Sequence, residues 1–229
     1  MNKKNLPDNI ALFIALLFHA AGAIGILFTP YKNWFIQNTP VNLLVMSALL
    51  IITQKQKNIY FFIFLIVACI VGFVIEYTGT NTALIFGHYT YENILGIKLF
   101  GVPLIIGVNW FIVIYCAGIA TQLYENKMLK RISGKGISIN TNVQKISFVI
   151  DAAVLAVFFD WVLEPVAGKL GFWQWEGGVI PFYNYVCWLI ISALLLSLFQ
   201  LLPFKKQNIF AVHLFIIQVL FFLVLRTFL

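Results

Sequence analysis

The sequence predicts an all-α, polytopic membrane protein with about seven transmembrane helices in a single integral membrane domain, residues 1–229. Hydrophobic residues make up 62% of the chain and charged residues only 10%, whereas soluble domains are about half apolar and about a quarter charged. The apolar residues also gather in long runs, and a run of about 20 forms a helix that crosses a bilayer. These observations exclude a soluble globular domain and a disordered chain.

Seven apolar segments, separated by short polar links, are the expected helices. The second segment is short, and the others approach the length of a full span. The first is not expected to be a signal peptide, because no small-residue cleavage site follows it. The predicted helices are Ile10–Phe28, Pro40–Thr53, Ile59–Tyr77, Val102–Tyr124, Ile146–Glu164, Phe182–Leu202 and Ile209–Phe228.

The basic residues predict how these helices are oriented. Eleven Lys and Arg residues fall in the N-terminal tail and the links on its side of the membrane, and four fall on the other side. Because cytoplasmic links are rich in Lys and Arg, we expect a cytoplasmic N-terminus in the inner (cytoplasmic) membrane. The polar stretch 125–145 lies on the same side and is predicted to be a cytoplasmic loop. The net charge of +7 therefore indicates contact with the lipid bilayer and no nucleic-acid partner.

The cysteines and histidines form no recognisable metal or disulfide pattern. Cys69, Cys116 and Cys187 lie within apolar segments and have no CxxC spacing, and the three histidines are scattered. The last predicted helix contains no lysine that could bind retinal, and no Asp-rich motif would bind magnesium diphosphate. We therefore expect neither a metal nor a cofactor.

Acidic residues at the predicted outer ends of the helices are the main functional candidates, because a carboxyl group in a membrane span is costly. Asp160 and Glu164 are four residues apart, so they share one face of a helix. Two negative charges this close oppose each other, and a carboxyl group that stays protonated near neutral pH is what an acid catalyst needs. The alternative is a solvated helix end, paired with Lys169 or Lys98.

Two outer links share an order of motifs, which predicts a parallel internal repeat of the third and fourth helices with the fifth and sixth. Each copy has a glutamate that ends a helix, an aromatic-x-aromatic-Glu motif, a proline and, seven residues later, a tryptophan. The site is expected between the copies, around an axis along the membrane normal. The alternative is an ordinary belt of interfacial Trp and Tyr. The first copy has Glu76, Tyr89, Tyr91, Glu92, Pro103 and Trp110, and the second has Glu164, Trp173, Trp175, Glu176, Pro181 and Trp188.

These motifs together resemble the membrane carotenoid biosynthesis family that includes the carotenoid 1,2-hydratases acting on γ-carotene and on C50 precursors such as bisanhydrobacterioruberin. The resemblance implies addition of water to the terminal C1=C2 double bond of an acyclic (ψ) carotenoid end, giving a tertiary alcohol. It implies a lycopene- or γ-carotene-like substrate. The segments that carry the resemblance are 76–79, 86–91, 99–110, 160–167 and 172–181.

In this interpretation Asp160, Glu164 and Glu76 form the acid/base set. Aromatic rings hold the apolar substrate and stabilise a developing cation, by ~0.5–2 kcal/mol per ring. Two alternatives stay open: a non-catalytic protein that binds carotenoid or lipid and passes pigment to other carotenoid enzymes, and a small proton-coupled transporter. The expected substrate-binding residues are Trp110, Asn109, Tyr89, Tyr91, Glu92, Trp173, Trp175, Glu176, Asn184 and Trp188, with Asn109 and Asn184 as groups that position water.

Overall fold

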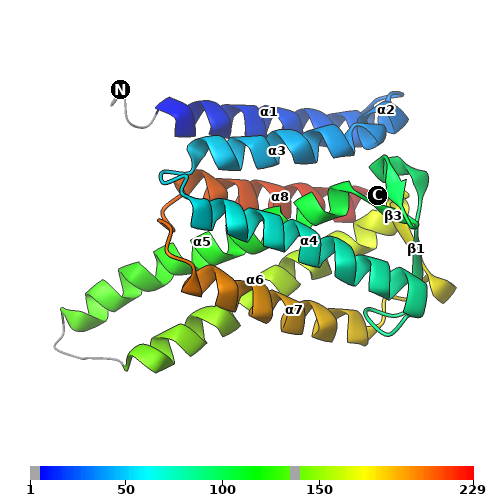
Figure 1. Cartoon of the computed structure of the whole chain (residues 1–229). Helices are drawn as coiled ribbons and strands as arrows, with labels where there is room; N and C mark the ends of the chain where they lie inside the picture. The colour runs from blue at the N-terminus through cyan, green and yellow to red at the C-terminus, as the bar shows by residue number, and fades with distance from the viewer. Residues whose placement is uncertain (1–5, 135–139) are drawn as a thin grey trace.

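The computed structural model describes residues 6–134 and 140–229 and shows a bundle of helices that run roughly side by side (Figure 1). Six of these helices are long and apolar enough to cross a membrane, which confirms an all-α polytopic membrane protein. The helices are α1 (Leu6–Phe28), α2 (Lys32–Gln37), α3 (Thr39–Thr53), α4 (Ile59–Thr82), α5 (Ile105–Ser133), α6 (Thr141–Lys169), α7 (Phe182–Leu201) and α8 (Ile209–Phe228).

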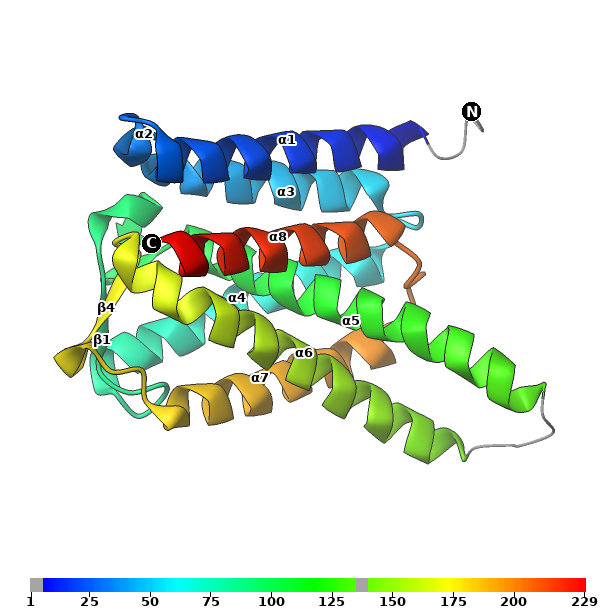
Figure 2. The same ribbon diagram turned by 180° about the vertical axis from the view of Figure 1, so that it is seen from behind.

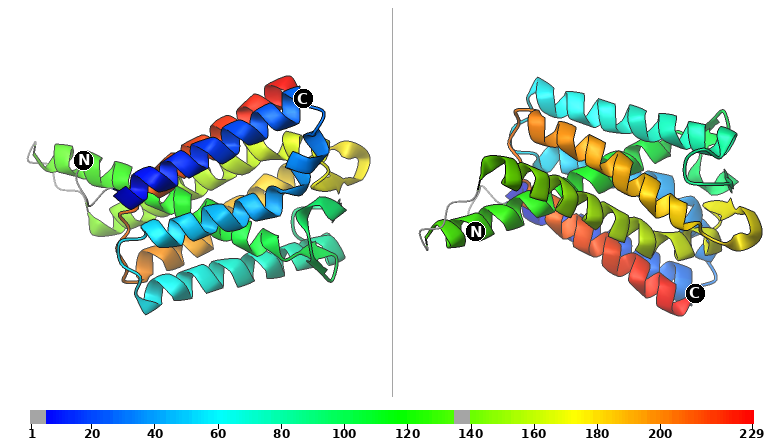
Figure 3. Two further views of the ribbon diagram at one scale, coloured as in Figure 1. Left: turned by 90° about the horizontal axis from the view of Figure 1, so that it is seen from above. Right: turned by 90° about the horizontal axis from the view of Figure 1, so that it is seen from below.

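The remaining one of the seven expected spans, the short second segment, is α3, which is shorter than the six long helices. Its 15 residues extend about 22 Å at ~1.5 Å per residue, less than the ~30 Å hydrocarbon core of a bilayer. It lies beside α1 and forms a layer with it over α8 (Figures 1 and 2). The view from above shows α1 running along α8 (Figure 3). The short α2 turns the chain back between α1 and α3, close enough that a Cβ on Gly25 would lie 2.2 Å from the Phe35 ring.

Helix α5 is the centre of the bundle, because it contacts α3, α4, α6, α7 and α8. Of its most apolar stretch of 18 residues, 78% are buried, whereas the share is 44% or less for every other long span in the described chain. The remaining spans turn one apolar face outward, as expected for helices that contact lipid. The most enclosed part of the bundle therefore surrounds α5.

The predicted cytoplasmic loop at 125–145 is largely helical, so this part of the prediction is corrected. Helix α5 continues to Ser133 and α6 begins at Thr141, and together they project beyond the bundle (Figure 1). The Asn140 side chain accepts a hydrogen bond from the Asn142 backbone N–H at 2.8 Å, which caps α6. Polar residues can continue a helix into water, a feature that hydropathy alone does not reveal. Residues 135–139 lie outside the described residues.

Two small antiparallel sheets close the other end of the bundle, which the predicted orientation makes the outer end. β1 (Tyr89–Tyr91) pairs with β4 (Trp173–Trp175), and β2 (Lys98–Leu99) pairs with β3 (Val102–Pro103). The expected helix start at Val102 is therefore wrong, and α5 begins at Ile105. Short 3₁₀ turns follow β1 and β4, at Asn93–Leu95 and Glu176–Gly178.

Helices α4 and α6 both continue beyond their expected ends. Glu76 and Glu164 therefore lie inside helices and not at helix termini. Pro165 lies within α6 and has no N–H to donate to the Trp161 carbonyl one turn earlier. The Arg226 side chain from α8 donates to that carbonyl at 3.3 Å and stacks over the Trp161 ring. The last helix thus supports the end of α6 that carries the acids.

Candidate functional site

Three carboxyl groups meet at the end of the bundle that the two small sheets close. Glu76 comes from α4, and Asp160 and Glu164 come from α6, one helical turn apart. Their exposed fractions are 6%, 1% and 4%, so none of them is a solvated helix end. All three line one cavity of about 20 Å³. The structure thus gathers the three predicted acids around a shared space.

Glu76 is held by three donors from neighbouring elements. The Tyr89 and Tyr91 hydroxyls both donate to Glu76 Oε2, the latter at 2.7 Å, and the Trp110 indole N–H donates to Oε1 at 2.9 Å. Side chains alternate along a strand, so β1 turns both tyrosines inward and Thr90 outward. Burial, followed by the negative charge of Glu76, raises the pKa of both tyrosine hydroxyls well above the ordinary value. They therefore remain donors.

Strand β4 provides hydrogen-bond donors to Glu164, as β1 does to Glu76. The indole N–H groups of Trp173 and Trp175 both donate to Glu164 Oε2, at 3.1 and 2.7 Å. The intervening Gln174 points away and donates to the Gly168 carbonyl at 2.9 Å. An indole nitrogen can only donate, so both bonds require an acceptor oxygen on Glu164.

Asp160 has a different environment from the two glutamates. The Asn184 side-chain amide, near the start of α7, donates to Asp160 Oδ2 at 2.8 Å. Among the described residues no other hydrogen-bond donor reaches this carboxyl group, although it is the most buried of the three. Asp160 is therefore the acid with the fewest donors around it.

The two predicted repeat copies contact each other reciprocally. Tyr89 lies opposite Trp175 and Tyr91 lies opposite Trp173. Between these pairs Thr90 lies opposite Gln174. The Glu92 N–H donates to the Phe172 carbonyl and the Glu176 N–H donates to the His88 carbonyl, both at 3.0 Å. Further in, the Trp110 and Trp188 rings stack with centroids 3.9 Å apart and planes 10° from parallel. These contacts follow the two-fold relation that the predicted repeat requires.

The chemistry of the two copies is nevertheless unequal. Asp160 lies four residues before Glu164, and the position four before Glu76 is Gly72. Asn184 lies four before Trp188, and the corresponding residue in the first copy is Ile106. A Cβ on Gly72 would lie 2.4 Å from Trp110 Cβ, so the first copy uses this position for close helix packing. The carboxyl–amide pair exists only in the second copy.

Glu92 and Glu176 do not belong to the cavity, which corrects two of the expected substrate-binding residues. Both are exposed at the outer surface, and Glu176 lies 3.8 Å from His88. The reason is strand alternation: if the aromatic residues on either side of Thr90 and Gln174 turn inward, the glutamates that follow turn outward. This pattern was readable in the sequence. The remaining expected pocket residues, Asn109 and Trp188 included, line the cavity, apart from Trp110, which is bonded to Glu76.

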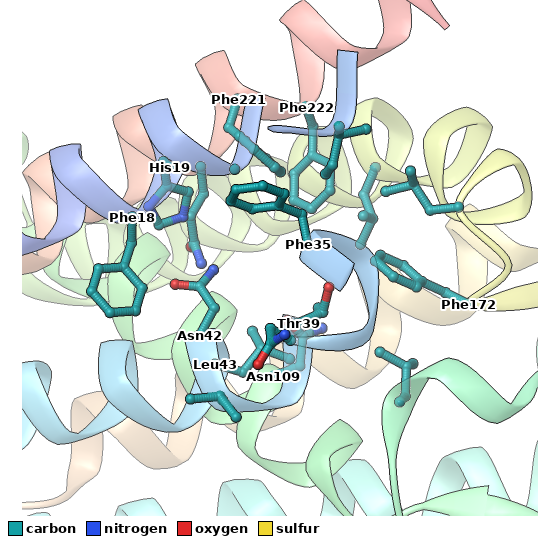
Figure 4. Close-up of a pocket in the computed structure, with 18 of the residues that line it drawn as sticks. Phe18, His19, Phe35, Thr39, Asn42, Leu43, Asn109, Phe172, Phe221 and Phe222 are labelled. Atoms are coloured by element: carbon teal, nitrogen blue, oxygen red, sulfur yellow. The ribbon is translucent and has the colours of Figure 1, made fainter. Parts of the chain in front are cut away.

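A second, larger pocket of about 430 Å³ lies next to the carboxyl cavity. The two share Ile106, Asn109, Leu163 and Trp173 as lining residues. Most of its other lining residues are apolar or aromatic side chains of α1, α2, α3, α6 and α8, including Phe18, Phe35, Phe221 and Phe222 (Figure 4). This pocket is not predictable from the sequence, because such residues look like ordinary helix-packing faces. Its volume lies within the range of small-molecule sites, ~300–1,000 Å³.

The donor set around the cavity consists of carboxyl, phenol, indole and amide groups. Within residues 6–134 and 140–229, no group of three His, Cys, Asp or Glu side chains is arranged to hold a metal ion. The site therefore offers proton-transfer groups and hydrogen-bond donors next to an apolar pocket.

Comparison with curated proteins and with solved structures finds no significant match. A family model described as "carotenoid biosynthesis protein" matches residues 38–229. The match includes every residue of the carboxyl cavity and leaves α1 and α2 outside. It confirms the resemblance seen in the motifs, and the chain belongs to the family of carotenoid biosynthesis proteins.

Proposed function

We propose that the protein adds water to the terminal C1=C2 double bond of an acyclic (ψ) carotenoid end, giving a tertiary alcohol. The observation that carries this proposal is the set of three buried carboxyl groups around a water-sized cavity, beside a large apolar pocket. Family membership supports a carotenoid as the substrate class. A lycopene- or γ-carotene-like chain has the apolar end that the larger pocket would hold.

The burial of the acids supports a proton donor among them. Charged carboxylates in an apolar interior are very costly unless a cation pairs with them. In the described part of the chain, the one ion pair is His88 with Glu176 at the surface, so the three cavity acids have no cationic partner. At least one of them is therefore best accommodated as the neutral acid.

Asp160 is the best candidate for this donor. Glu76 has three donors and Glu164 has two, and such hydrogen bonds favour the charged form of a carboxyl group. Asp160 has only the Asn184 amide, which can turn to accept a hydrogen bond from a protonated acid. Asp160 can thus carry a proton at lower cost than either glutamate.

In the proposed step, the Asp160 carboxyl group delivers its proton to C2 of the substrate. The π electrons form the new C2–H bond and leave a tertiary cation at C1, which the Glu76 and Glu164 carboxylates and the surrounding rings stabilise. Water attacks C1 and releases a proton to Glu164, and return of that proton to Asp160 completes the cycle. The net change is the addition of one water molecule.

The small cavity is the place for the attacking water. A volume of ~10–15 Å³ is enough for one water molecule if polar partners surround it, and the cavity measures about 20 Å³. The amides of Asn109 and Asn184 line it together with the acids. We place this site on the outer side of the inner (cytoplasmic) membrane, because the eleven-to-four distribution of basic residues orients the opposite end of the bundle towards the cytoplasm.

The test is expression in a lycopene- or γ-carotene-producing host, with pigments analysed by mass spectrometry. We expect a product heavier by one water molecule, with its oxygen taken from isotope-labelled water. Asp160→Asn should abolish it at equal protein level. Asp151→Asn is the matched control, because Asp151 is an exposed acid on the same helix, outside the site. Label from dioxygen, pigment bound with unchanged mass, or a fully active Asp160→Asn variant would each contradict the proposal.

A further inference from the structure

Five His, Asn, Gln or Thr side chains of the large pocket are not used by the proposed hydration. Two of them, Asn38 and Thr39, donate to the backbone carbonyls of Trp34 and Ile36, which leaves three. His19 comes from α1, Asn42 from α3 and Gln218 from α8, and all three line the pocket (Figure 4 shows His19 and Asn42 facing its interior). His19 and Gln218 are 5% and 4% exposed. Polar groups buried among apolar side chains are costly unless they find hydrogen-bond partners.

The hydrogen bond of His19 determines what its ring can offer. Nδ1 lies 2.8 Å from the Ala15 carbonyl oxygen, which can only accept, so Nδ1 carries the proton. In a neutral imidazole, the other nitrogen, Nε2, is then an acceptor. The ring edge packs against Phe221 with centroids 5.4 Å apart, which fixes its orientation. No hydrogen-bond donor of the described residues reaches Nε2.

The two amides are also without complete partners. Asn42 Oδ1 and Gln218 Oε1 are buried atoms with no hydrogen-bond partner in the described residues. These oxygens are closed off from the pocket space, so the NH₂ group on the other arm of each amide, which no hydrogen bond of the described residues uses, is what each side chain can offer to a ligand. Most buried polar groups are satisfied in native proteins, so these unused NH₂ groups and His19 Nε2 indicate a ligand group that can both accept and donate.

We propose that the large pocket binds an apolar chain through one hydroxyl group held by His19, Asn42 and Gln218. A hydroxyl group can donate to His19 Nε2 and accept from an amide NH₂ at the same time. A carbonyl group cannot donate to Nε2, a hydrocarbon can do neither, and a carboxylate would meet no cation among the lining residues. The isoprenoid nature of the chain rests on the proposed function, in which the hydrated product carries a hydroxyl group and the hydrocarbon substrate does not, so the subsite would favour the hydrated end over the substrate end. The preference for a hydroxyl group itself does not rest on the proposed function.

This subsite is separate from the carboxyl cavity. Its polar groups come from α1, α3 and α8, whereas the acids and their donors come from α4 to α7 and the paired strands β1 and β4. His19 also lies in the part of the chain that the family match leaves out. The N-terminal helix therefore adds a contact to a pocket most of whose lining residues lie in the family region.

The experiment compares two ligands that differ only in the polar group. Tritiated geranylgeraniol is bound to the purified protein in detergent. The unlabelled alcohol and the hydrocarbon with a methyl group in place of its hydroxymethyl group serve as competitors. We expect the alcohol to bind about 3–10 times more tightly, which is the effect of a net hydrogen bond. Equal affinity for the two ligands would overturn the proposal.

Variants assign this preference to the cluster. His19→Leu and Gln218→Leu should bring the affinity ratio close to one and leave the affinity for the hydrocarbon unchanged. His213→Leu is the matched control, because this second histidine of the bundle lies on α8 but does not line the pocket. If both leucine variants still bind the alcohol more tightly than the hydrocarbon, the proposal is contradicted. It is also contradicted if the control variant loses this preference. If a leucine variant does not fold, the affinity ratio is measured for Gln218→Met instead. Together with the wild-type ratio, this value still tests the proposal.

The same measurement on Asp160→Asn separates this proposal from the hydration proposal. We expect that variant to keep its preference for the alcohol although it forms no hydrated product. If wild-type protein forms no hydrated product but keeps the preference, only the hydration proposal fails. If hydration occurs and the two ligands bind equally, only the hydroxyl subsite fails.

Discussion

Gly72→Ala tests whether close packing of α4 on α5 positions the carboxyl site. The added Cβ would lie 2.4 Å from Trp110 Cβ, 2.5 Å from its Cγ and 2.8 Å from its Cδ1. Because Trp110 Cβ is attached to the backbone, no change of rotamer relieves the first contact. Ordinary contact begins at 3.4 Å, so the helices must separate by about 1 Å (3.4 minus 2.4).

The expected consequences concern both stability and activity. Overpacking of this kind costs about 1–3 kcal/mol of folding free energy. Trp110 also donates to Glu76 at 2.9 Å and stacks on Trp188, so its displacement disturbs the acid site directly. A misplacement of about 1 Å can lower a rate on the order of 100-fold. We expect a lower Tm in detergent and a loss of hydrated product of that order.

Gly168→Ala provides the matched control for this prediction. Gly168 lies in α6 close to the same site, but the nearest atom to its added Cβ is 3.8 Å away, an ordinary contact. Alanine favours a helix over glycine by about 1 kcal/mol, so this variant should be at least as stable as the wild type. Thermal unfolding and product formation are measured for both variants. A Gly72→Ala protein that is as stable and active as Gly168→Ala would refute the packing argument.

Two further predictions concern tyrosines at opposite ends of the bundle. Tyr115 donates to Gln54 Oε1 at 2.6 Å and accepts from Asn208 at 3.2 Å. Asn208 also donates to the Leu50 carbonyl and to Thr53 Oγ1, so Tyr115→Phe leaves one buried acceptor, Gln54 Oε1, unpaired. It should lower the free energy of unfolding by about 1–3 kcal/mol, and an unchanged Tm would contradict this. The raised pKa of Tyr89 and Tyr91 means that neither ionises as the pH rises through about 10, where free tyrosine does. The absorbance change of tyrosine ionisation should therefore have the same amplitude in Tyr89→Phe and Tyr91→Phe as in the wild type, and a smaller amplitude would show that the hydroxyl titrates normally.

The apolar segments were predictable because each depends on residues close together in the sequence. Every expected span corresponds to a helix, α3 included. The errors lie at the ends, where α4 and α6 extend past Glu76 and Glu164 and where Val102–Pro103 forms a strand. Hydropathy marks where a helix contacts lipid, but it does not mark where hydrogen bonding and capping end the helix.

The contents of the carboxyl site were predictable from the order of motifs, but their pairing was not. The two aromatic-x-aromatic-Glu segments were identified as copies, and the structure places them against each other as β1 and β4. Strand alternation would have excluded Glu92 and Glu176, because it requires only the local period of two. The role of Gly72 as the close-packed counterpart of Asp160 is visible only when both copies are seen in space.

The sequence by itself determined the class of the protein and the residue types available for chemistry. A chain inside a bilayer must satisfy its own backbone hydrogen bonds, and a run of about 20 apolar residues does so as a helix. The composition and the length of the apolar runs therefore leave few alternatives. Only the tertiary structure decided that Glu76 shares a cavity with Asp160 and Glu164, and that a polar cluster lies in the larger pocket beside it. These arrangements depend on how separate helices pack, and packing is the sum of many weak contacts between residues far apart in the chain.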